Sequence, residues 1–345
     1  MKGYYVIAEI GVNFYDTAKS LNLSPLDAAK MYIFKAKESG ADAVKFQSYK
    51  ADTIVSKNSP AYWDLEKEST PTQHALFLKH DGFNKADYQT LCDYANEVGV
   101  DFMSTPFDFE SADYLDEMID IYKISSSDLT NIPFIRHIAK KGKTIYLSTG
   151  ASYISEIDNA VRAIKEEGCQ DLCVMHCVLS YPTKNEDANL DMIKHLKQIF
   201  PDVAIGYSDH TLPDENMTIL AAAYMNGATI IEKHFTLDKS LTGNDHYHSM
   251  DEKDLAAAIK NLDLIDIVRG SDKKTVLDCE LTPRKEARRS LVLTRDLKAG
   301  QSITENDIML KRPGTGISPE HIDVVIGRTA KQDLTEDTVL TWDMI

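Results

Sequence analysis

Two histidines follow short apolar runs in the chain, at a spacing that could support metal chemistry. His210 ends the run AIGYSDH and His234 lies near the end of TIIEKHF. Both runs have the length and the β-branched or aromatic content of a buried strand, so each imidazole is expected where a strand ends. Two neutral imidazoles from neighbouring strands can hold a divalent ion and leave positions open for water and a substrate oxygen.

Other polar side chains are expected at the same strand ends. Lys45 in AVKFQ and Lys123 in YKISS interrupt apolar runs, and a two-residue period puts Lys45 on one face with Ala43 and Gln47. Applied to every run, this period gives a set of candidate inward-facing residues near the strand ends: Glu9, Thr105, Lys123, Ser148, Ser208, His210, Glu232 and His234. Two lysines with hydroxyls and backbone amides would form a cradle for a phosphate group.

Each of these residues taken alone also has an ordinary structural explanation. A serine at a strand end often caps the next helix, a strand lysine usually extends to solvent, and two histidines fall short of the four ligands of a structural zinc site. Their convergence favours a shared site, because so many polar groups are costly to bury at one place without a ligand.

Eight strand-like runs could hold these groups together. They span residues 4–11, 43–47, 101–106, 122–126, 144–150, 172–177, 204–210 and 229–235. Amphipathic stretches with apolar residues at helical spacing separate them. Strand and helix alternating eight times predicts an α/β fold, a (β/α)₈ TIM barrel over residues 1–270.

The remainder of the chain is expected to form a different unit. Residues 271–286 are polar and charged, which predicts a linker. The runs SLVLT, DIMLK and VLTWDM, separated by glycine and proline, then predict a small β-rich domain over residues 287–345.

Composition narrows the class of protein. The 345 residues carry a formal net charge of −16, which disfavours nucleic acid and anionic membranes as partners. No apolar run approaches the roughly 20 residues of a membrane span, and Glu9 interrupts the apolar start, so we expect no signal peptide. The five cysteines lack the paired spacing of a zinc site, and we expect reduced thiols in a cytoplasmic protein.

The motifs resemble those of the N-acetylneuraminate (sialic acid) synthase family, the bacterial nonulosonic acid synthases. In chain order they are AEIGVN, VKFQ, STPFD, YKISSSDL, STGAS, SYPT, GYSDHT and EKHFT, and then RRSL, AGQSIT and KRPGTGI, which resemble the family's SAF, or antifreeze-like, domain. The resemblance implies that phosphoenolpyruvate condenses with the open-chain aldehyde of an N-acetylated amino sugar. Phosphate is released, and the product is a nine-carbon 2-keto sugar acid such as sialic, legionaminic or pseudaminic acid.

The resemblance also implies a ligand set for two of the reaction's components. His210 and His234 would hold a divalent ion, usually Mn²⁺ in this family, with Mg²⁺ or Co²⁺ as alternatives. The residues that match phosphoenolpyruvate-binding positions are Lys45, Thr105, Lys123, Ser126, Ser148 and Ser208. Ser126 is out of phase with Lys123, so the fourth strand must end before it.

Further site residues follow from the same resemblance. Glu9 and Asp245 match acids of the family's active site. Tyr181 and Glu232 match positions that shape the site or bind the sugar, and we group Glu232 with the catalytic acids. Glu9 is our first choice for moving the proton of the attacking water, with Asp245 or a water on the ion as alternatives.

The resemblance implies an oligomeric site as well. Arg312, in KRPGTGI, matches an arginine that the family's SAF domain presents to the sugar from the partner subunit of a domain-swapped homodimer.

The sequence departs from the family pattern at positions that bear on the sugar. Leu179 stands where synthases of N-acetylneuraminate commonly carry asparagine, and Phe14 stands where histidine is frequent. N-acetylmannosamine and the 6-deoxy diacetamido hexoses therefore both remain candidate substrates. Residues 62–83 could form part of the sugar pocket or a surface excursion.

Two other classes of function are compatible with the pattern. A Schiff-base aldolase on the same barrel could use Lys123 as its nucleophile, because a lysine inside a barrel strand can lose its proton. A non-catalytic carbohydrate-binding protein would use the SAF-like part to bind sugar without releasing phosphate.

Overall fold

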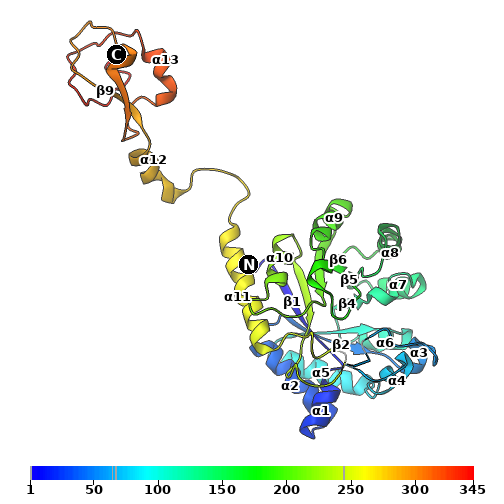
Figure 1. Ribbon diagram of the computed structural model, residues 1–345. Coiled ribbons are helices and arrows are strands. Elements are labelled where there is room, and N and C mark those ends of the chain that lie inside the picture. The colour runs from blue at the N-terminus through cyan, green and yellow to red at the C-terminus, as the bar shows by residue number, and fades with distance from the viewer. Residues whose placement is uncertain (1, 64, 67, 244) are drawn as a thin grey trace. The chain divides into compact units, whose positions relative to one another are not determined.

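Eight parallel strands form the centre of the first unit of the chain, and helices surround them (Figure 1). The computed structural model describes residues 2–63, 65–66, 68–243 and 245–345, which divide into two units, 1–270 and 271–345. The strands are β1 Tyr5–Gly11, β2 Ala43–Ser48, β3 Asp101–Pro106, β4 Ile121–Ile124, β5 Thr144–Ser148, β6 Leu172–Cys177, β7 Ala204–Asp209 and β8 Ile230–His234.

The strands curl into a barrel that is nearly closed. They pair in the order β3-β2-β1-β8-β7-β6-β5-β4, so the first strand joins the last. β3 and β4 lie side by side, but no paired ladder joins them in the part of the chain that the structure describes. The predicted TIM-barrel class is confirmed.

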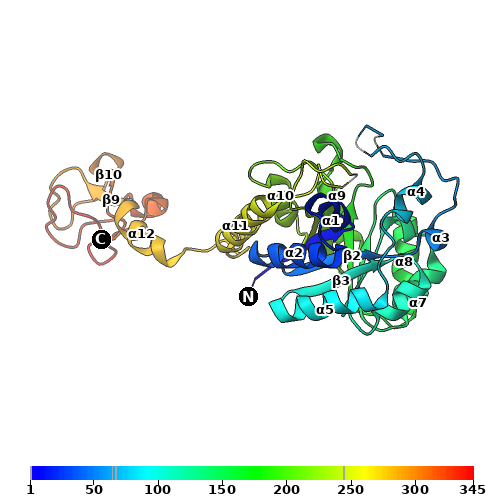
Figure 2. The same cartoon turned by 90° about the horizontal axis from the view of Figure 1, so that it is seen from below.

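The connections between the strands carry the helices. Those that follow one another around the barrel are α2 Pro25–Glu38, α5 Lys85–Val98, α6 Phe109–Leu115, α7 Ile132–Ala139, α8 Ile154–Glu166, α9 Asp191–Ile199, α10 Thr218–Met225 and α11 Glu252–Arg269. In Figure 2, α2 lies between α5 and α11, and it contacts both. No helix among the described residues is long and apolar enough to cross a membrane.

Three further helices lie in the long connections after β1 and β2. They are α1 Phe14–Leu21, α3 Ala51–Ile54 and α4 Gln73–Leu78. The insertions lengthen the loops on the side of the barrel where the carboxyl ends of β1 and β2 emerge, which is the face that carries active sites in this fold.

Alternation along the strands decides which side chains face the barrel interior. Val44 and Phe46 of β2 are buried in the core between strands and helices. Ala43 of the same strand instead belongs to the interior cluster with Ile7 and Met103. Lys45 is only 3% exposed and follows Ala43 in phase, so it points into the barrel as predicted.

The second unit has its own small core around an antiparallel strand pair. β9 Ser290–Leu293 pairs with β10 Ile308–Lys311, and the unit also carries α12 Leu281–Ala287 and α13 Ile322–Val325. The third predicted strand, VLTWDM, is wrong, because this segment makes only one isolated bridge, between Val339 and Val292. Most of α12 falls within the predicted linker 271–286.

Candidate active site

A cavity of about 410 Å³ lies at the carboxyl ends of the barrel strands. The residues predicted for the site that line it are Glu9, Lys45, Thr105, Lys123, Ser126, Ser148, Tyr181, Ser208, His210, Glu232, His234 and Asp245. Arg312 belongs to the second unit, directly after β10. Strand alternation predicted part of this set, and the resemblance to the synthase family added Ser126, Tyr181 and Asp245; all of them line the one cavity.

Backbone pairing brings the charged residues of the cavity into line. Glu9 on β1 pairs with Lys45 on β2 and, on its other side, with His234 on β8. Glu232 of β8 pairs with Ser208 of β7. The β1–β2 ladder shifts register before Gly11, whose φ of +55° is open to glycine and strained for other residues.

Two lysines and two glutamates form a buried ionic network in the cavity. Lys45 Nζ lies 2.5 Å from Glu9 Oε2 and donates to Thr105 Oγ1 at 2.9 Å. Lys123 Nζ donates to Glu232 Oε1 at 3.0 Å, and Lys45 lies 3.9 Å from Glu232 Oε2. These four charged side chains are at most 5% exposed, so water contributes little to their solvation.

The two glutamates of this network have pKa values shifted in opposite directions. Burial raises the pKa of Glu9, and the opposing effect of the Lys45 ammonium does not cancel it. Burial alone would also raise the pKa of Glu232, but Lys123 and Lys45 outweigh it and lower that pKa to about 2. Environments that separate the pKa values of two carboxyls also separate their roles, so Glu9 suits proton transfer and Glu232 suits a lasting negative charge.

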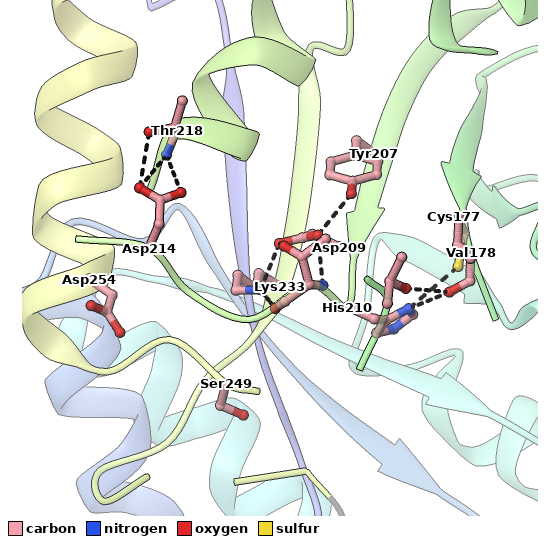
Figure 3. Close-up of polar contacts among 12 residues, drawn as sticks. Cys177, Val178, Tyr207, Asp209, His210, Asp214, Thr218, Lys233, Ser249 and Asp254 are labelled. Atoms are coloured by element: carbon pink, nitrogen blue, oxygen red, sulfur yellow. Dashed lines mark hydrogen bonds and ion pairs between the residues drawn. The ribbon is translucent and has the colours of Figure 1, made fainter. Parts of the chain in front are cut away.

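The two predicted histidines lie together with their rings 5.5 Å apart between centroids. His210 Nδ1 lies 3.0 Å from the carbonyl oxygen of Val178, which can only accept, so Nδ1 carries the hydrogen and Nε2 the lone pair (Figure 3). Burial lowers the pKa of His210 to about 4 and that of His234 well below its usual range. Both imidazoles are therefore neutral and can donate lone pairs near pH 7.

Several polar atoms of the cavity remain without a hydrogen-bond partner. Among the described residues, Ser148 Oγ, Glu232 Oε2 and His234 Nδ1 are buried and accept or donate no hydrogen bond. An unpaired buried polar atom costs about 1–3 kcal/mol, so such a group in a cavity indicates a ligand that is not part of the chain.

Aromatic and apolar side chains form the outer part of the cavity wall. From residues 62–83 the lining residues are Tyr62, Trp63, Gln73, Leu76, Phe77 and His80. Asp64 and Lys67 of this stretch lie outside the described residues. The stretch is thus part of the cavity rather than a detached excursion. Leu179 also lines the cavity, whereas Phe14 packs in the core against Phe46 and Phe83.

The fourth strand ends before Ser126, as the sequence analysis predicted. β4 ends at Ile124, and Ser126 Oγ accepts a hydrogen bond from Gly150 N at 2.9 Å.

Sequence reasoning missed His248, which is buried with its ring centroid 5.1 Å from that of His234. Its only sequence signal is the alternation of histidines in GNDHYHS, a segment without strand periodicity.

Comparison with known proteins gives two domain matches and similar relatives along the whole chain. The model of the NeuB family matches residues 32–274, and that of the SAF domain matches residues 288–345. The N,N'-diacetyllegionaminic acid synthase of Legionella pneumophila is 38% identical over 99% of this chain and 94% of its own length. The protein MJ1065 of Methanocaldococcus jannaschii is 39% identical over 98% and 94%.

A solved structure agrees with both the fold and the sequence matches. The N-acetylneuraminic acid (sialic acid) synthetase from Leptospira borgpetersenii, solved in complex with citrate, is 31% identical. The superposition has a TM-score of 0.70 and covers 81% of this chain and 90% of the chain in the solved structure.

Proposed function

Because the chain belongs to the NeuB family, we propose that it is a nonulosonic acid synthase that condenses phosphoenolpyruvate with the aldehyde of an N-acetylated amino sugar. C3 of phosphoenolpyruvate bonds to the aldehyde carbon, water adds at C2, and the C2–O bond to phosphate breaks. The products are a nine-carbon 2-keto sugar acid and inorganic phosphate. The observation that carries the proposal is the buried network of two lysines and two glutamates in the cavity.

The charge of this network suits phosphoenolpyruvate. The substrate carries one carboxylate and a phosphate with about −1.5 to −2 charges at neutral pH. The two ammonium groups balance the two carboxylates, so the four side chains are neutral overall while Glu9 is ionised and carry one positive charge once Glu9 has taken up a proton. A divalent cation would supply most of the further positive charge that the substrate requires. Ser148 Oγ, which has no hydrogen-bond partner among the described residues, is then free to donate to a substrate oxygen.

The donor atoms of the cavity fit a divalent metal ion. His210 and His234 present neutral imidazoles, and an oxygen of Asp245 lies 3.8 Å from His234 Nδ1. We propose that these side chains hold Mn²⁺, with Mg²⁺ or Co²⁺ as alternatives. When bound, such an ion polarises the aldehyde carbonyl toward attack.

The two glutamates then take separate parts in the reaction. Positive charge develops at C2 of the enol phosphate as its C3 attacks, and the anionic Glu232 stabilises that charge. Glu9, whose pKa is raised by burial, accepts the proton of the water that adds at C2. Asp245 remains the alternative proton acceptor.

The wall of the cavity favours a sugar with fewer hydroxyl groups. The side chain of Leu179 offers no hydrogen bond, and Tyr62, Trp63 and Phe77 also line the cavity. A hydrophobic wall gains from a methyl group where a polar wall would bind a hydroxyl. We therefore propose a 6-deoxy diacetamido hexose as the substrate, supported by the similarity to a legionaminic acid synthase, with N-acetylmannosamine as the alternative.

The second unit would contribute Arg312 to the sugar site of a partner subunit in a homodimer. This proposal rests on the motif KRPGTGI. Sedimentation of the full chain would test the dimer. Arg312→Ala should raise KM for the sugar and leave the KM for phosphoenolpyruvate nearly unchanged.

The decisive experiment measures phosphate release from phosphoenolpyruvate by the purified chain. The 6-deoxy diacetamido hexose and N-acetylmannosamine are tested separately, each together with Mn²⁺, with and without a chelator. Release with one sugar only, abolished by the chelator, is the expected result. No release with any of them, together with trapping of pyruvate on the enzyme by borohydride, would instead support an aldolase that uses Lys123.

A further inference from the structure

The segment after β8 folds back beside the end of that strand and brings a third histidine to the first two. Met250 N donates to His234 O at 2.8 Å, and Thr236 N donates to Met250 O at 2.9 Å. These bonds make a single parallel bridge between Phe235 and Met250. His248 precedes Met250 by two residues, and its ring is thereby held against that of His234.

His248 is buried in a way that an ordinary core histidine is not. It is 0% exposed, and neither ring nitrogen has a hydrogen-bond partner among the described residues. Two other buried histidines are satisfied: His246 Nδ1 lies 2.8 Å from Thr236 Oγ1, and His176 Nε2 lies 2.8 Å from the carbonyl oxygen of Ala188. Since a buried unpaired polar group is costly, His248 calls for a partner beyond the described residues, and a bound ion would supply one.

The distances between the rings suit a shared metal ion. The centroid of His248 lies 5.1 Å from that of His234 and 6.4 Å from that of His210. With a metal–nitrogen bond of about 2.1 Å and roughly 1.1 Å from that nitrogen to its ring centre, two imidazoles on one ion have centroids at most about 6.4 Å apart. Ligand atoms of His234, Asp245 and His248 lie within 4.8 Å of one another, a group that does not include His210.

We propose that His248 binds the same divalent ion as His234, as a third imidazole ligand beyond the two that the motifs predicted. This inference rests on the proposed function in that the ion is the one held in the synthase site. A set of three imidazoles and one carboxylate contains more nitrogen than Mg²⁺ prefers. Affinity should therefore rise from Mg²⁺ through Mn²⁺ to Co²⁺.

The test measures Mn²⁺ binding to the full chain without substrates, by the EPR signal of the free ion. His248→Phe should weaken Mn²⁺ binding at least about 10-fold, because loss of a ligand should cost no less than loss of an outer partner. His176→Phe makes the same chemical change at another buried histidine and should bind Mn²⁺ as the wild type does. Equal affinity in His248→Phe and the wild type would overturn the proposal.

A second measurement decides the matter without a variant. Pulsed EPR of Mn²⁺ bound to the wild-type chain counts the coupled histidine nitrogens, and three are expected. Two would overturn the third ligand and leave the metal site of the proposed function standing. If the wild type binds no Mn²⁺ at all, the metal site of the proposed function fails, and His248 as its ligand fails with it.

Discussion

Two buried charge clusters lie on opposite faces of the barrel sheet and meet at β8, and they differ in whether the described residues satisfy them. On the helix-facing side of β7 and β8, Lys233 Nζ donates to Asp209 Oδ2 at 2.6 Å (Figure 3). Tyr207 OH, Thr211 N and Thr211 Oγ1 also donate to that carboxylate, at 2.8 to 3.0 Å. Lys233 donates in addition to the carbonyl oxygen of Thr211 at 2.6 Å.

The cavity-facing cluster is incomplete by comparison. Glu232 precedes Lys233 in β8, yet its Oε2 has no hydrogen-bond partner among the described residues and lies 3.9 Å from Lys45 Nζ. Both clusters are almost fully buried, so burial alone does not distinguish structure from function. The difference lies in the unpaired atoms. A cluster whose polar atoms all have hydrogen-bond partners stabilises the barrel, whereas a cluster with unpaired polar atoms is suited to binding a ligand.

The largest expected effect is the loss of stability when the satisfied cluster is broken. Lys233→Met leaves the Asp209 carboxylate buried without its cation and should lower the free energy of unfolding by about 3–5 kcal/mol. Lys45→Met should cost much less, because Glu9, with its raised pKa, can take up a proton and become neutral. Urea unfolding of both variants measures the contrast. Equal losses would show that the two clusters do not differ in structural weight.

The next effect concerns catalysis rather than stability. Glu9→Gln keeps the shape and the hydrogen bond that Gln47 Nε2 donates to Oε1 at 2.9 Å, but removes the group that moves the proton. We expect kcat to fall about 100-fold or more, with much smaller loss of phosphoenolpyruvate binding. Steady-state kinetics with phosphate release as the readout gives both values. An unchanged kcat would exclude Glu9 from the chemistry.

A smaller effect separates the hydroxyls of the two clusters. Ser148→Ala removes a hydroxyl that has no hydrogen-bond partner in the described part of the chain, so stability should stay constant while phosphoenolpyruvate binding weakens about 10-fold. Tyr207→Phe removes a hydrogen bond to Asp209 and should do the reverse, with a loss of about 1.5 kcal/mol in stability and unchanged binding. A stability loss in Ser148→Ala would contradict this division.

The same strands explain what the sequence could predict. The two-residue period placed Ser208 and Glu232 toward the cavity, because strand geometry fixes the face of every second residue. It could not tell that Asp209 and Lys233, on the opposite face, would satisfy each other, since the pairing depends on the register of β7 and β8. His248 escaped detection because a bridge between Phe235 and Met250, rather than any periodicity, sets its place.

The prediction of a third strand in the second unit failed for a related reason. VLTWDM has the composition of a strand, but composition alone does not supply a pairing partner. Only Val339 of this segment bridges to Val292 of β9. Every barrel strand has a neighbouring strand on both sides, since β3 and β4 lie side by side although no ladder joins them in the described residues. The strands are therefore buried, and their apolar runs made them predictable.

The smallest effect extends the comparison to a satisfied carboxylate of the second unit. Asp307 accepts hydrogen bonds from Thr304 N at 2.8 Å and Thr304 Oγ1 at 2.7 Å, and Arg295 Nε lies 2.5 Å from its other oxygen. Burial raises its pKa, but the Thr304 hydrogen bonds and Arg295 outweigh burial, and the pKa is lowered overall. A lowered carboxyl pKa stabilises the fold above the unfolded-state value near 4, and this stability is lost as pH falls through the folded-state value.

Asp307→Asn should therefore flatten the acid limb of the stability profile of the second unit and leave that of the barrel unchanged. The chain's two tryptophans, Trp63 in the barrel and Trp342 in the second unit, allow the two to be followed separately. In a Trp63→Phe background, Trp342 fluorescence reports urea unfolding of the second unit alone between pH 3 and pH 6, a range around the ordinary carboxyl pKa of about 4. If the acid limb is as steep in Asp307→Asn as in the background chain, the Thr304 and Arg295 contacts do not stabilise the ionised carboxyl. Satisfaction of a buried carboxylate would then be no guide to stability in this unit.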